Sequence, residues 1–393
     1  MRRVEKWLVV ALLNSVAIQA STYLARPMIT YKLLELHSHS FIVGSFGALY
    51  ALFPLILAIP LGRWINQFGE GRFIALGTFV IALSTIALAS THNRFFMVIF
   101  VATLGTSQLL AMAGAQALFA NRTPRAHYES YFGYYTFSAA LGQLIGPLIG
   151  ASVSGAGGVL PRSTSNAFYA SAIIAMLGLI PLAFGMPMKP TIGISAKNSR
   201  ESASLTRLLS NPGMLVAMYA SLAVSSTVDV LVVFLPLFGK ERGFSSGAIG
   251  IILAIRAASS MLSRVNLGKL TAWVGYFRLL VGSIALSSIA CLVALFSRTP
   301  LFLGIVILLA GFSLGVGQPM TMAWVSRISR DDERSFAISI RLAGNRLGQF
   351  LLPALAGLIS GVFGVGAVFV ALALLMSSST PYILKEAKNS PKA

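Results

Sequence analysis

FFMVIFVATLGTSQLLAMAGAQALF, residues 95–119, runs for 25 residues without one charged side chain. The hydrocarbon core of a bilayer is ~30 Å thick, and a helix of ~20 apolar residues crosses it. Because nothing inside that layer can hydrogen-bond an open backbone, only a helix or a closed barrel can span it. The stretch therefore predicts one membrane-spanning helix.

The rest of the chain has the same character. Of its 393 residues, 56% are hydrophobic and 10% are charged, and the mean hydropathy is +0.80. Soluble domains carry roughly 25% charged residues, so a soluble chain of this composition could not cover its surface with polar groups. The same length criterion predicts an all-α integral membrane protein with twelve spans. The spans are expected at residues 7–26, 42–62, 73–91, 95–119, 132–154, 166–187, 213–238, 246–264, 279–297, 301–325, 336–360 and 364–383.

The twelve spans fall into two groups of six. The longest polar stretch, residues 189–211, separates the two groups. It contains Pro190, several serines and the charged residues Lys189, Lys197, Arg200, Glu201 and Arg207. We therefore expect a six-helix bundle over residues 1–188, a cytoplasmic linker over 189–211 and a second six-helix bundle over 212–393.

Basic residues outnumber acidic ones by 30 to 11 and gather in the short gaps between spans. This is the pattern of cytoplasmic loops in membrane proteins, and it argues against a nucleic-acid partner. With both termini inside, the cytoplasmic segments hold 20 of the 30 Lys and Arg, and three lie in spans. The seven outer ones are Arg26, Lys32, Arg94, Arg162, Lys240, Arg242 and Arg298. We expect a multi-pass protein of the cell inner membrane with both termini cytoplasmic.

The two halves repeat each other at a fixed offset of 206 residues. The pairs are Gly62 with Gly268, Gly69 with Gly275, Arg72 with Arg278, Gly105 with Gly311, Gly142 with Gly348, and Pro147 with Pro353. A constant register in three separate regions indicates a duplicated unit in parallel orientation. In such proteins the substrate site lies between the halves, near the bilayer midplane.

Two motifs carry a family resemblance. Residues 62–72 read GRWINQFGEGR, with Gly62, Gly69 and Arg72 at the positions of a tight loop. Span 132–154 contains Gly133, Gly142, Gly146-Pro147, Gly150 and Ala151. The loop resembles the signature loop of the major facilitator superfamily, although Asn66 and Gln67 stand where that loop has an acid and an arginine. The glycine series resembles the motif of the superfamily's drug:proton antiporters; it is also compatible with general helix packing.

The resemblance covers essentially the whole chain. It implies two pseudo-symmetric six-helix bundles and secondary transport by alternating access, with proton-coupled export of a small solute as the first hypothesis. Proton-coupled uptake of an organic anion or a sugar is the alternative. A membrane enzyme or receptor would need buried catalytic pairs or a large soluble domain, and neither is visible. The implied partners are a solute, protons and membrane lipids, and the protein is expected to be a monomer.

Charges inside spans are costly in lipid and therefore mark functional candidates. Asp229 continues a polar row with Ser221 and Ser225 at intervals of four residues, so one helix face is polar. Asp229 is the expected proton-coupling residue. The alternative is a permanent ion pair with Arg256, and a pair that breaks and re-forms would serve both roles.

Arg341, Asn345 and Arg346 lie close together in span 336–360. With Arg256 they leave about two more cations than acids within the spans of the second half, and arginine suits carboxylates and phosphates. The expected solute is therefore anionic or rich in hydrogen-bond acceptors. In the competing interpretation, Arg341 serves the positive-inside pattern and Arg346 bonds backbone carbonyls.

The first half is expected to have no charge within its spans. Its binding candidates are Gln19, Gln108 and Gln116, and Gln318 is added from the Gly/Pro-interrupted span 301–325. Hydrogen bonds between helices are the alternative role for these residues. The single cysteine, Cys291, and the four histidines lack metal-ligand spacing, and no phosphate-binding glycine loop is present. We expect no cofactor.

Overall fold

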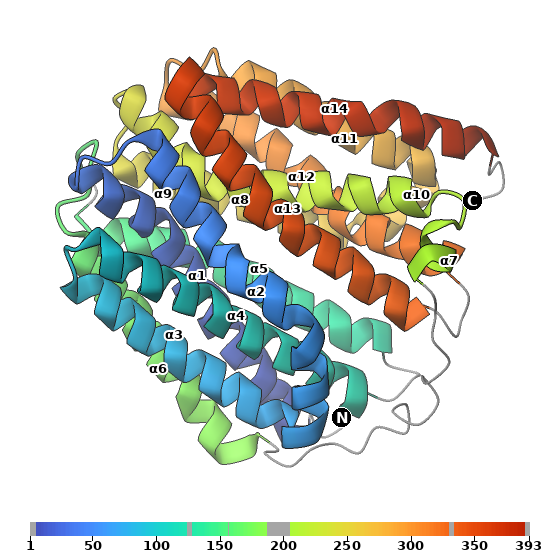
Figure 1. Ribbon diagram of the computed structural model, residues 1–393, viewed down its shortest axis with the longest axis horizontal. Coiled ribbons are helices and arrows are strands. Elements are labelled where there is room, and N and C mark those ends of the chain that lie inside the picture. The colour runs from blue at the N-terminus through green and yellow to red at the C-terminus, as the bar shows by residue number, and fades with distance from the viewer. Residues whose placement is uncertain (1–4, 124–127, 156, 187–204, 330–333, 390–393) are drawn as a thin grey trace. The chain divides into compact units, whose positions relative to one another are not determined.

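The computed structural model describes residues 5–123, 128–155, 157–186, 205–329 and 334–389. These residues form fourteen α-helices (Figure 1). Twelve of the helices are long and apolar enough to cross a membrane, which confirms the prediction of an all-α protein with twelve spans. Most of the predicted linker, residues 189–204, lies outside the described residues, and its last part contains the short helix α7 (Leu205–Leu209).

The spans of the first half are six helices. They are α1 (Lys6–Glu35), α2 (Ser40–Phe68), α3 (Glu70–Ser90), α4 (Arg94–Arg122), α5 (Tyr128–Val153) and α6 (Thr164–Gly185). The second half has a short additional helix, α10, after its second span. Its helices are α8 (Met214–Glu241), α9 (Ser246–Val265), α10 (Leu267–Val274), α11 (Tyr276–Ala294), α12 (Pro300–Ile328), α13 (Arg334–Phe363) and α14 (Gly366–Asn389).

Contacts divide the chain into two compact units. Unit 1 comprises residues 1–39, 49–194 and 243–254, and unit 2 comprises residues 40–48, 195–242 and 255–393. In unit 1, α1 packs against α5 and α6, and α3 packs against α4 and α6. In unit 2, α8 packs against α13 and α14, and α11 packs against α12 and α14. Corresponding helices of the two halves therefore form the same pairs.

One close helix contact recurs in both units at the offset found in the sequence. A methyl group on Gly105 of α4 would lie 1.8 Å from the carbonyl oxygen of Tyr50 in α2. A methyl group on Gly311 of α12 would lie 2.5 Å from the carbonyl oxygen of Arg256 in α9. Both residues of the second pair lie 206 positions after those of the first. Only glycine lets the two backbones approach this closely.

The glycines of α5 make a second recurring contact. Gly142 lies against the carbonyl of Val16 in α1, at 2.4 Å from an added methyl group. Its counterpart Gly348 lies against Leu222 and Ser226 of α8, at 2.6 and 2.3 Å. Val16 and Leu222 are again 206 positions apart. The duplication inferred from glycine spacing is thus present in the packing of each unit.

The first helix is longer than predicted. The predicted span ends at residue 26, whereas α1 continues to Glu35 and contains Arg26 and Lys32. Both side chains are buried, with exposed fractions of 6% and 1%. Two predictions are therefore wrong: Arg26 and Lys32 do not lie in an outer loop, and the first half does have charges within a spanning helix. Each cation has partners on neighbouring helices, described below, which allow the helix to continue.

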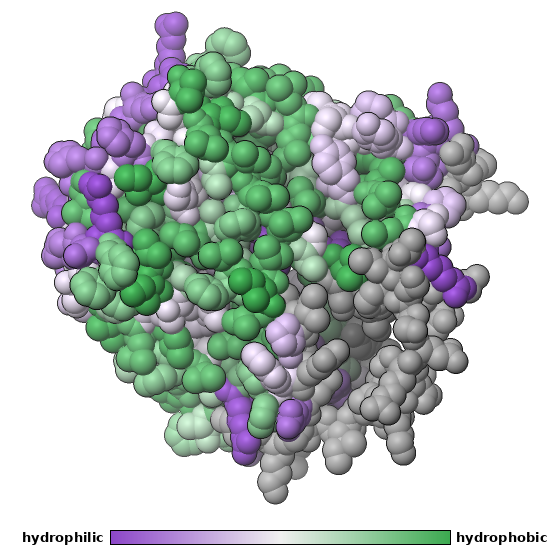
Figure 2. Space-filling model, viewed as in Figure 1, coloured by the Kyte–Doolittle hydropathy of each residue, from purple (hydrophilic) through white to green (hydrophobic). Residues whose placement is uncertain are grey.

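The surface of the helices is rich in apolar side chains. Phe95, Phe184, Phe296 and Leu301 are each more than two-thirds exposed, with Phe184 at 82%. Figure 2 shows broad apolar areas on the face in view, with the strongly hydrophilic side chains gathered toward helix ends and loops. Such a surface is stable against lipid chains and would aggregate in water.

A methyl group added at Gly105 or Gly311 should lower the thermal stability far more than one added at a glycine with open space around it. Replacing Gly311 by Ala forces a methyl group against the Arg256 backbone, and overpacking of this kind costs ~1–3 kcal/mol. We expect a drop of several degrees in the apparent Tm in detergent, and a similar drop for Gly105→Ala. Gly282→Ala in α11 is the matched control, because nothing lies within 4 Å of the added methyl group. Equal Tm values for Gly311→Ala and Gly282→Ala would contradict the close contact.

Candidate functional site

The polar row predicted on α8 is buried and meets cationic and amide groups of unit 2. Ser221 and Ser225 are 0% and 2% exposed, and Asp229 is 9% exposed. Arg341 of α13 donates from Nη1 to the Ser221 hydroxyl oxygen at 2.6 Å. The face of α8 that the sequence marked as polar is therefore in contact with a predicted solute-binding arginine.

Gln318 of α12 links a second arginine to the same face. Its Nε2 atom donates to the Ser225 hydroxyl at 3.4 Å, and its Oε1 atom accepts from Nη2 of Arg264 at 2.9 Å. Arg264 lies one residue before the end of α9 and was missed in the sequence, where it counted as a span-end cation. Sequence spacing does not single out Arg264, because only the fold shows that its side chain reaches Gln318.

The remaining predicted residues of unit 2 are also placed by the structure. Arg256 is 2% exposed and lies beneath Gly311, as described above. Asn345 is 7% exposed, and its Oδ1 atom has no hydrogen-bond partner among the described residues. Arg346 is half-buried and donates to Oε1 of Gln349 in its own helix, at 2.9 Å.

Unit 1 contains a matching set of polar contacts. Gln19 of α1 donates to the sulfur of Met112 in α4 at 3.2 Å. Gln108 of α4 accepts a hydrogen bond from the hydroxyl of Tyr50 in α2. Gln116, two turns after Gln108, is half-buried on the same helix. Gln19 of α1 therefore contacts α4 between Gln108 and Gln116, at Met112.

The two sets occupy equivalent positions of the repeat. Adding 206 to Gln19 and Met112 gives Ser225 and Gln318, the pair that is hydrogen-bonded in unit 2. The same addition takes Tyr50 to Arg256. The equivalent helix faces thus meet at the same register, and at the last of these positions unit 2 carries a charge where unit 1 has a tyrosine.

Arg26 is a buried cation of unit 1, although the sequence predicts it in an outer loop. Its guanidinium carbon lies 4.6 Å from the ring centre of Tyr50 and 5.9 Å from that of Tyr23. A cation over an aromatic face is stabilised by the quadrupole of the ring. Tyr23 is the counterpart of Asp229, so the position that is acidic in unit 2 is an aromatic cation partner in unit 1.

Lys32 has a structural explanation. Its ammonium group donates to the carbonyls of Leu88 and Ala89 at 2.5 and 3.3 Å, and lies 5.6 Å from the ring centre of Phe168. These carbonyls belong to the last turn of α3, where the helix dipole favours a cation. Lys32 therefore joins the ends of α1 and α3, and it is not needed for solute binding.

Residues 62–72, expected as a loop, are helical on both sides of Gly69, because α2 continues to Phe68 and α3 begins at Glu70. The segment also contains a buried acid that the motif does not predict. Glu70, the first residue of α3, is 1% exposed and accepts from Nδ2 of Asn121 in α4 at 2.6 Å. Gly69 has a positive φ of 97°, and its repeat partner Gly275 has a φ of 90°, so both loops turn at a glycine. Arg72 is exposed. The signature acid at position 66 is absent, but a buried carboxylate follows the turn.

The sequence of the chain matches the family model described as "Major Facilitator Superfamily" over residues 11–286 and 274–391. The chain belongs to the major facilitator superfamily. Curated relatives include Multidrug resistance protein 2 of Bacillus subtilis (strain 168), which is 22% identical over 363 residues and is matched over 91% of this chain and 90% of its own length. A multidrug resistance protein MdtG of Yersinia enterocolitica is 25% identical over 340 residues, covering 84% and 80% of the two chains.

Solved structures of superfamily transporters share the fold. The nucleoside transporter NupG superposes with a TM-score of 0.79 at 15% identity, covering 96% of this chain and 99% of the other. A D-xylose–proton symporter gives a TM-score of 0.78 at 15% identity, covering 97% of each chain. The resemblance inferred from the two motifs is therefore confirmed, and the chain is a twelve-span membrane transporter of this superfamily.

The bond between Arg341 and Ser221 should be important for stability. Ser221→Ala leaves a buried guanidinium N–H without its acceptor, and a hydrogen bond to a charged group contributes about 1.5–3 kcal/mol. We expect a clear loss of thermal stability in detergent. Ser379→Ala is the control, because the hydroxyl of Ser379 is equally buried but bonds only the carbonyl of Met376 in its own helix. A Ser221→Ala protein as stable as the Ser379→Ala protein would contradict this role.

Proposed function

We propose that the protein is a proton-coupled exporter of a small polar or anionic organic solute, working by alternating access. The names of several curated relatives, which are multidrug resistance proteins of bacteria, support export. The glycine series of α5 that resembles the antiporter motif supports it as well. We place the protein in the cell inner membrane as a monomer with both termini cytoplasmic.

Asp229 is the proposed proton-coupling residue. It is a buried acid on the polar face of α8, on which Ser221 contacts Arg341 and Ser225 contacts Gln318. Adding a proton to the carboxyl removes the negative charge from a region that also holds Arg341 and Arg256. The balance of charge around the α8 face therefore changes with each protonation, as a coupling mechanism requires.

The observation that carries the solute class is the surplus of buried cations. Of the cations proposed to bind solute in unit 2, Arg256 and Arg341 are buried and Arg346 is half-buried, and the buried acid in the described part of that unit is Asp229. Three cations against one acid leave two positive charges, which an anionic solute would balance. Guanidinium groups are suited to carboxylates and phosphates because of their planar array of donors.

Two buried polar atoms support the position of the binding residues. In the described part of the chain, Nε of Arg341 and Oδ1 of Asn345 have no hydrogen-bond partner, although both side chains are buried. An unsatisfied buried donor or acceptor costs ~1–3 kcal/mol, so it is a natural place for a ligand to bind. We propose as solute-binding residues Arg256, Gln318, Arg341, Asn345 and Arg346 of unit 2, and Gln19, Gln108 and Gln116 of unit 1.

The glycine motifs have a conformational role in this proposal. Gly142 and Gly146 lie on the face of α5 that approaches α1, and the carbonyl of Pro147 lies beside Gly250. The motif glycines Gly62 and Gly268 lie in α2 and α10, which lead to the turns at Gly69 and Gly275. Uptake of an organic anion or sugar is the second candidate. It is favoured by the similarity of the fold to that of a D-xylose–proton symporter.

Asp229→Asn should abolish proton-coupled transport while leaving the protein folded. The amide keeps the size of the side chain but cannot take up or release a proton. In proteoliposomes with an imposed pH gradient, we expect solute flux driven by the gradient to fall more than tenfold. Glu386→Gln in α14 is the control and should keep full activity. Gradient-driven flux in Asp229→Asn equal to that of the wild type would remove the coupling role.

Arg346→Ala should weaken transport of an acidic solute far more than transport of a neutral one. The lost guanidinium contributes to binding of a carboxylate but not of an uncharged analogue, so a difference of about tenfold in KM is expected. The measurement compares paired acidic and neutral analogues in the same vesicles. Arg278→Ala, an exposed arginine at the start of α11, is the control. Equal losses for both analogues would count against an anionic solute.

The direction of coupling separates export from uptake. If the protein is an exporter, adding solute to the cytoplasmic side should collapse a pH gradient that is acidic outside. Uptake predicts that solute and protons move together into the vesicle lumen that represents the cytoplasm. Vesicles of known orientation and a lumenal pH dye give the answer.

A further inference from the structure

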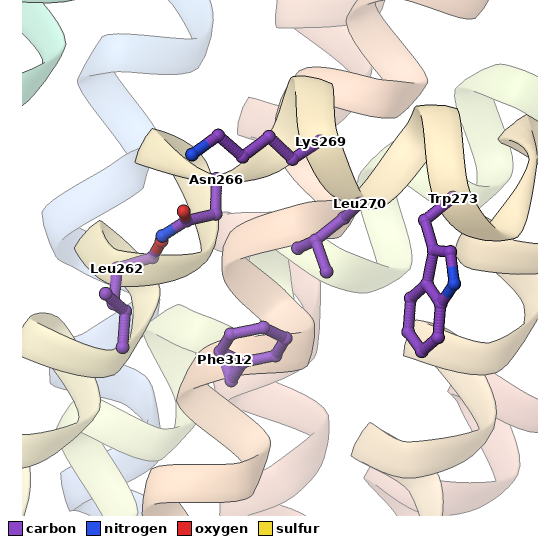
Figure 3. Close-up of a pocket in the computed structure, with 6 residues that line it drawn as sticks. All are labelled: Leu262, Asn266, Lys269, Leu270, Trp273 and Phe312. Atoms are coloured by element: carbon purple, nitrogen blue, oxygen red, sulfur yellow. The ribbon is translucent and has the colours of Figure 1, made fainter.

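Unit 2 has a groove away from the polar face of α8. It has a volume of about 410 Å³ and is formed by the end of α9, by α10 and by α12 (Figure 3). Its walls are Leu262, Asn266, Lys269, Leu270, Trp273 and Phe312. Pockets that bind small ligands have volumes of ~300 to 1,000 Å³. The groove is at the lower end of this range, so it can hold a small ligand or one part of a larger one, such as a lipid chain.

The groove divides into a polar rim and an apolar floor. Figure 3 shows the side chains of Lys269 and Asn266 together at one edge, with Leu262, Leu270 and Phe312 below them and Trp273 to the side. Trp273 is 85% exposed and Leu262 is 58% exposed. A ligand that fits both regions carries an anionic or polar head and an apolar chain.

The position of the groove places it at the membrane surface. The spanning part of α9 ends at Val265, and α10 begins two residues later as a separate short helix with no buried residue. Tryptophan is enriched at the boundary between hydrocarbon and headgroups, where its ring contacts chains and its N–H contacts water. Trp273 and Lys269, which follow the end of this span, are therefore suited to contact lipid headgroups, while Phe312 lies within the span α12.

Lys269 is the charged residue among those that line the groove, and the nearest charged residues along the chain are Arg264 and Arg278. Juxtamembrane cations of this kind attract the anionic lipids of the cytoplasmic leaflet, the leaflet that this end of α9 faces in the proposed orientation.

We propose that the groove is a binding site for one anionic phospholipid, with its phosphate at Lys269 and one acyl chain along Leu262, Leu270 and Phe312. The proposal does not depend on the transported solute or on proton coupling. It assigns a role to α10, a helix that has no counterpart in the first half, where α2 continues without a break to Phe68.

The test uses Trp273 as a probe of bound lipid. The full-length protein is placed in nanodiscs of phosphatidylcholine that contain a rising fraction of either phosphatidylglycerol or phosphatidylcholine with brominated chains. Bromine quenches nearby tryptophan, and subtracting the signal of Trp273→Phe isolates Trp273 from the other three tryptophans. We expect half-maximal quenching at about a fivefold lower fraction of brominated phosphatidylglycerol than of brominated phosphatidylcholine.

The headgroup preference should depend on the charge of Lys269 alone. Lys269→Gln should abolish the fivefold preference, and Lys269→Arg should keep it. Lys385→Gln, which removes an exposed lysine of α14, is the matched control and should behave as the wild type. Equal quenching by the two lipids in the wild type would overturn the proposal, because it would mean ordinary lipid contact. A preference that survives in Lys269→Gln would overturn it as well.

Discussion

The contact of a glycine with the backbone of a neighbouring helix sets the geometry on which the rest of this protein depends. Lipid chains are as apolar as leucine, so the hydrophobic effect does not drive helices together within a membrane. Close van der Waals packing at small residues takes its place. Gly105 on Tyr50 and Gly311 on Arg256 are the same contact, made once in each half. It fixes which side chains of neighbouring helices can meet.

That shared geometry holds different chemistry in the two halves. Tyr23 and Tyr50 of unit 1 occupy the positions that Asp229 and Arg256 occupy in unit 2. The first unit therefore presents aromatic rings and amides around one arginine, while the second presents an acid and several arginines. A duplicated fold allows this division, because one copy can keep the packing while the other acquires ionisable groups. In our proposal the second copy carries the proton coupling.

Much of the fold could be predicted from the sequence, because lipid imposes simple rules. Runs of twenty apolar residues predict the spans, and the glycine pairs at a constant offset predict the duplication. The polar row on α8 also followed from sequence, since residues four apart share a helix face. Ser221 and Ser225 indeed contact polar groups of other helices.

The errors have a common physical cause. Arg26 and Lys32 were placed in a loop because a hydropathy criterion ends a span at a charge. The structure continues the helix, since aromatic rings and helix-end carbonyls stabilise both cations. The roles of Glu70 and Arg264 likewise depend on partners that lie on helices distant in sequence. Glu70 bonds Asn121, and Arg264 bonds Gln318. Side-chain partners of this kind depend on the fold, and spacing alone does not reveal them.

The central claim is that two parallel copies of one six-helix unit form the transporter, and cysteine accessibility tests it most directly. The single native cysteine, Cys291, is buried, so its replacement by Ala gives a silent background. New cysteines at Glu5, Ser195 and Lys388 should react with a membrane-impermeant maleimide only in inside-out vesicles. A cysteine at Arg298 should react only from outside intact cells. Labelling of positions 5 and 388 from opposite sides would contradict the parallel duplication and the transport account that rests on it.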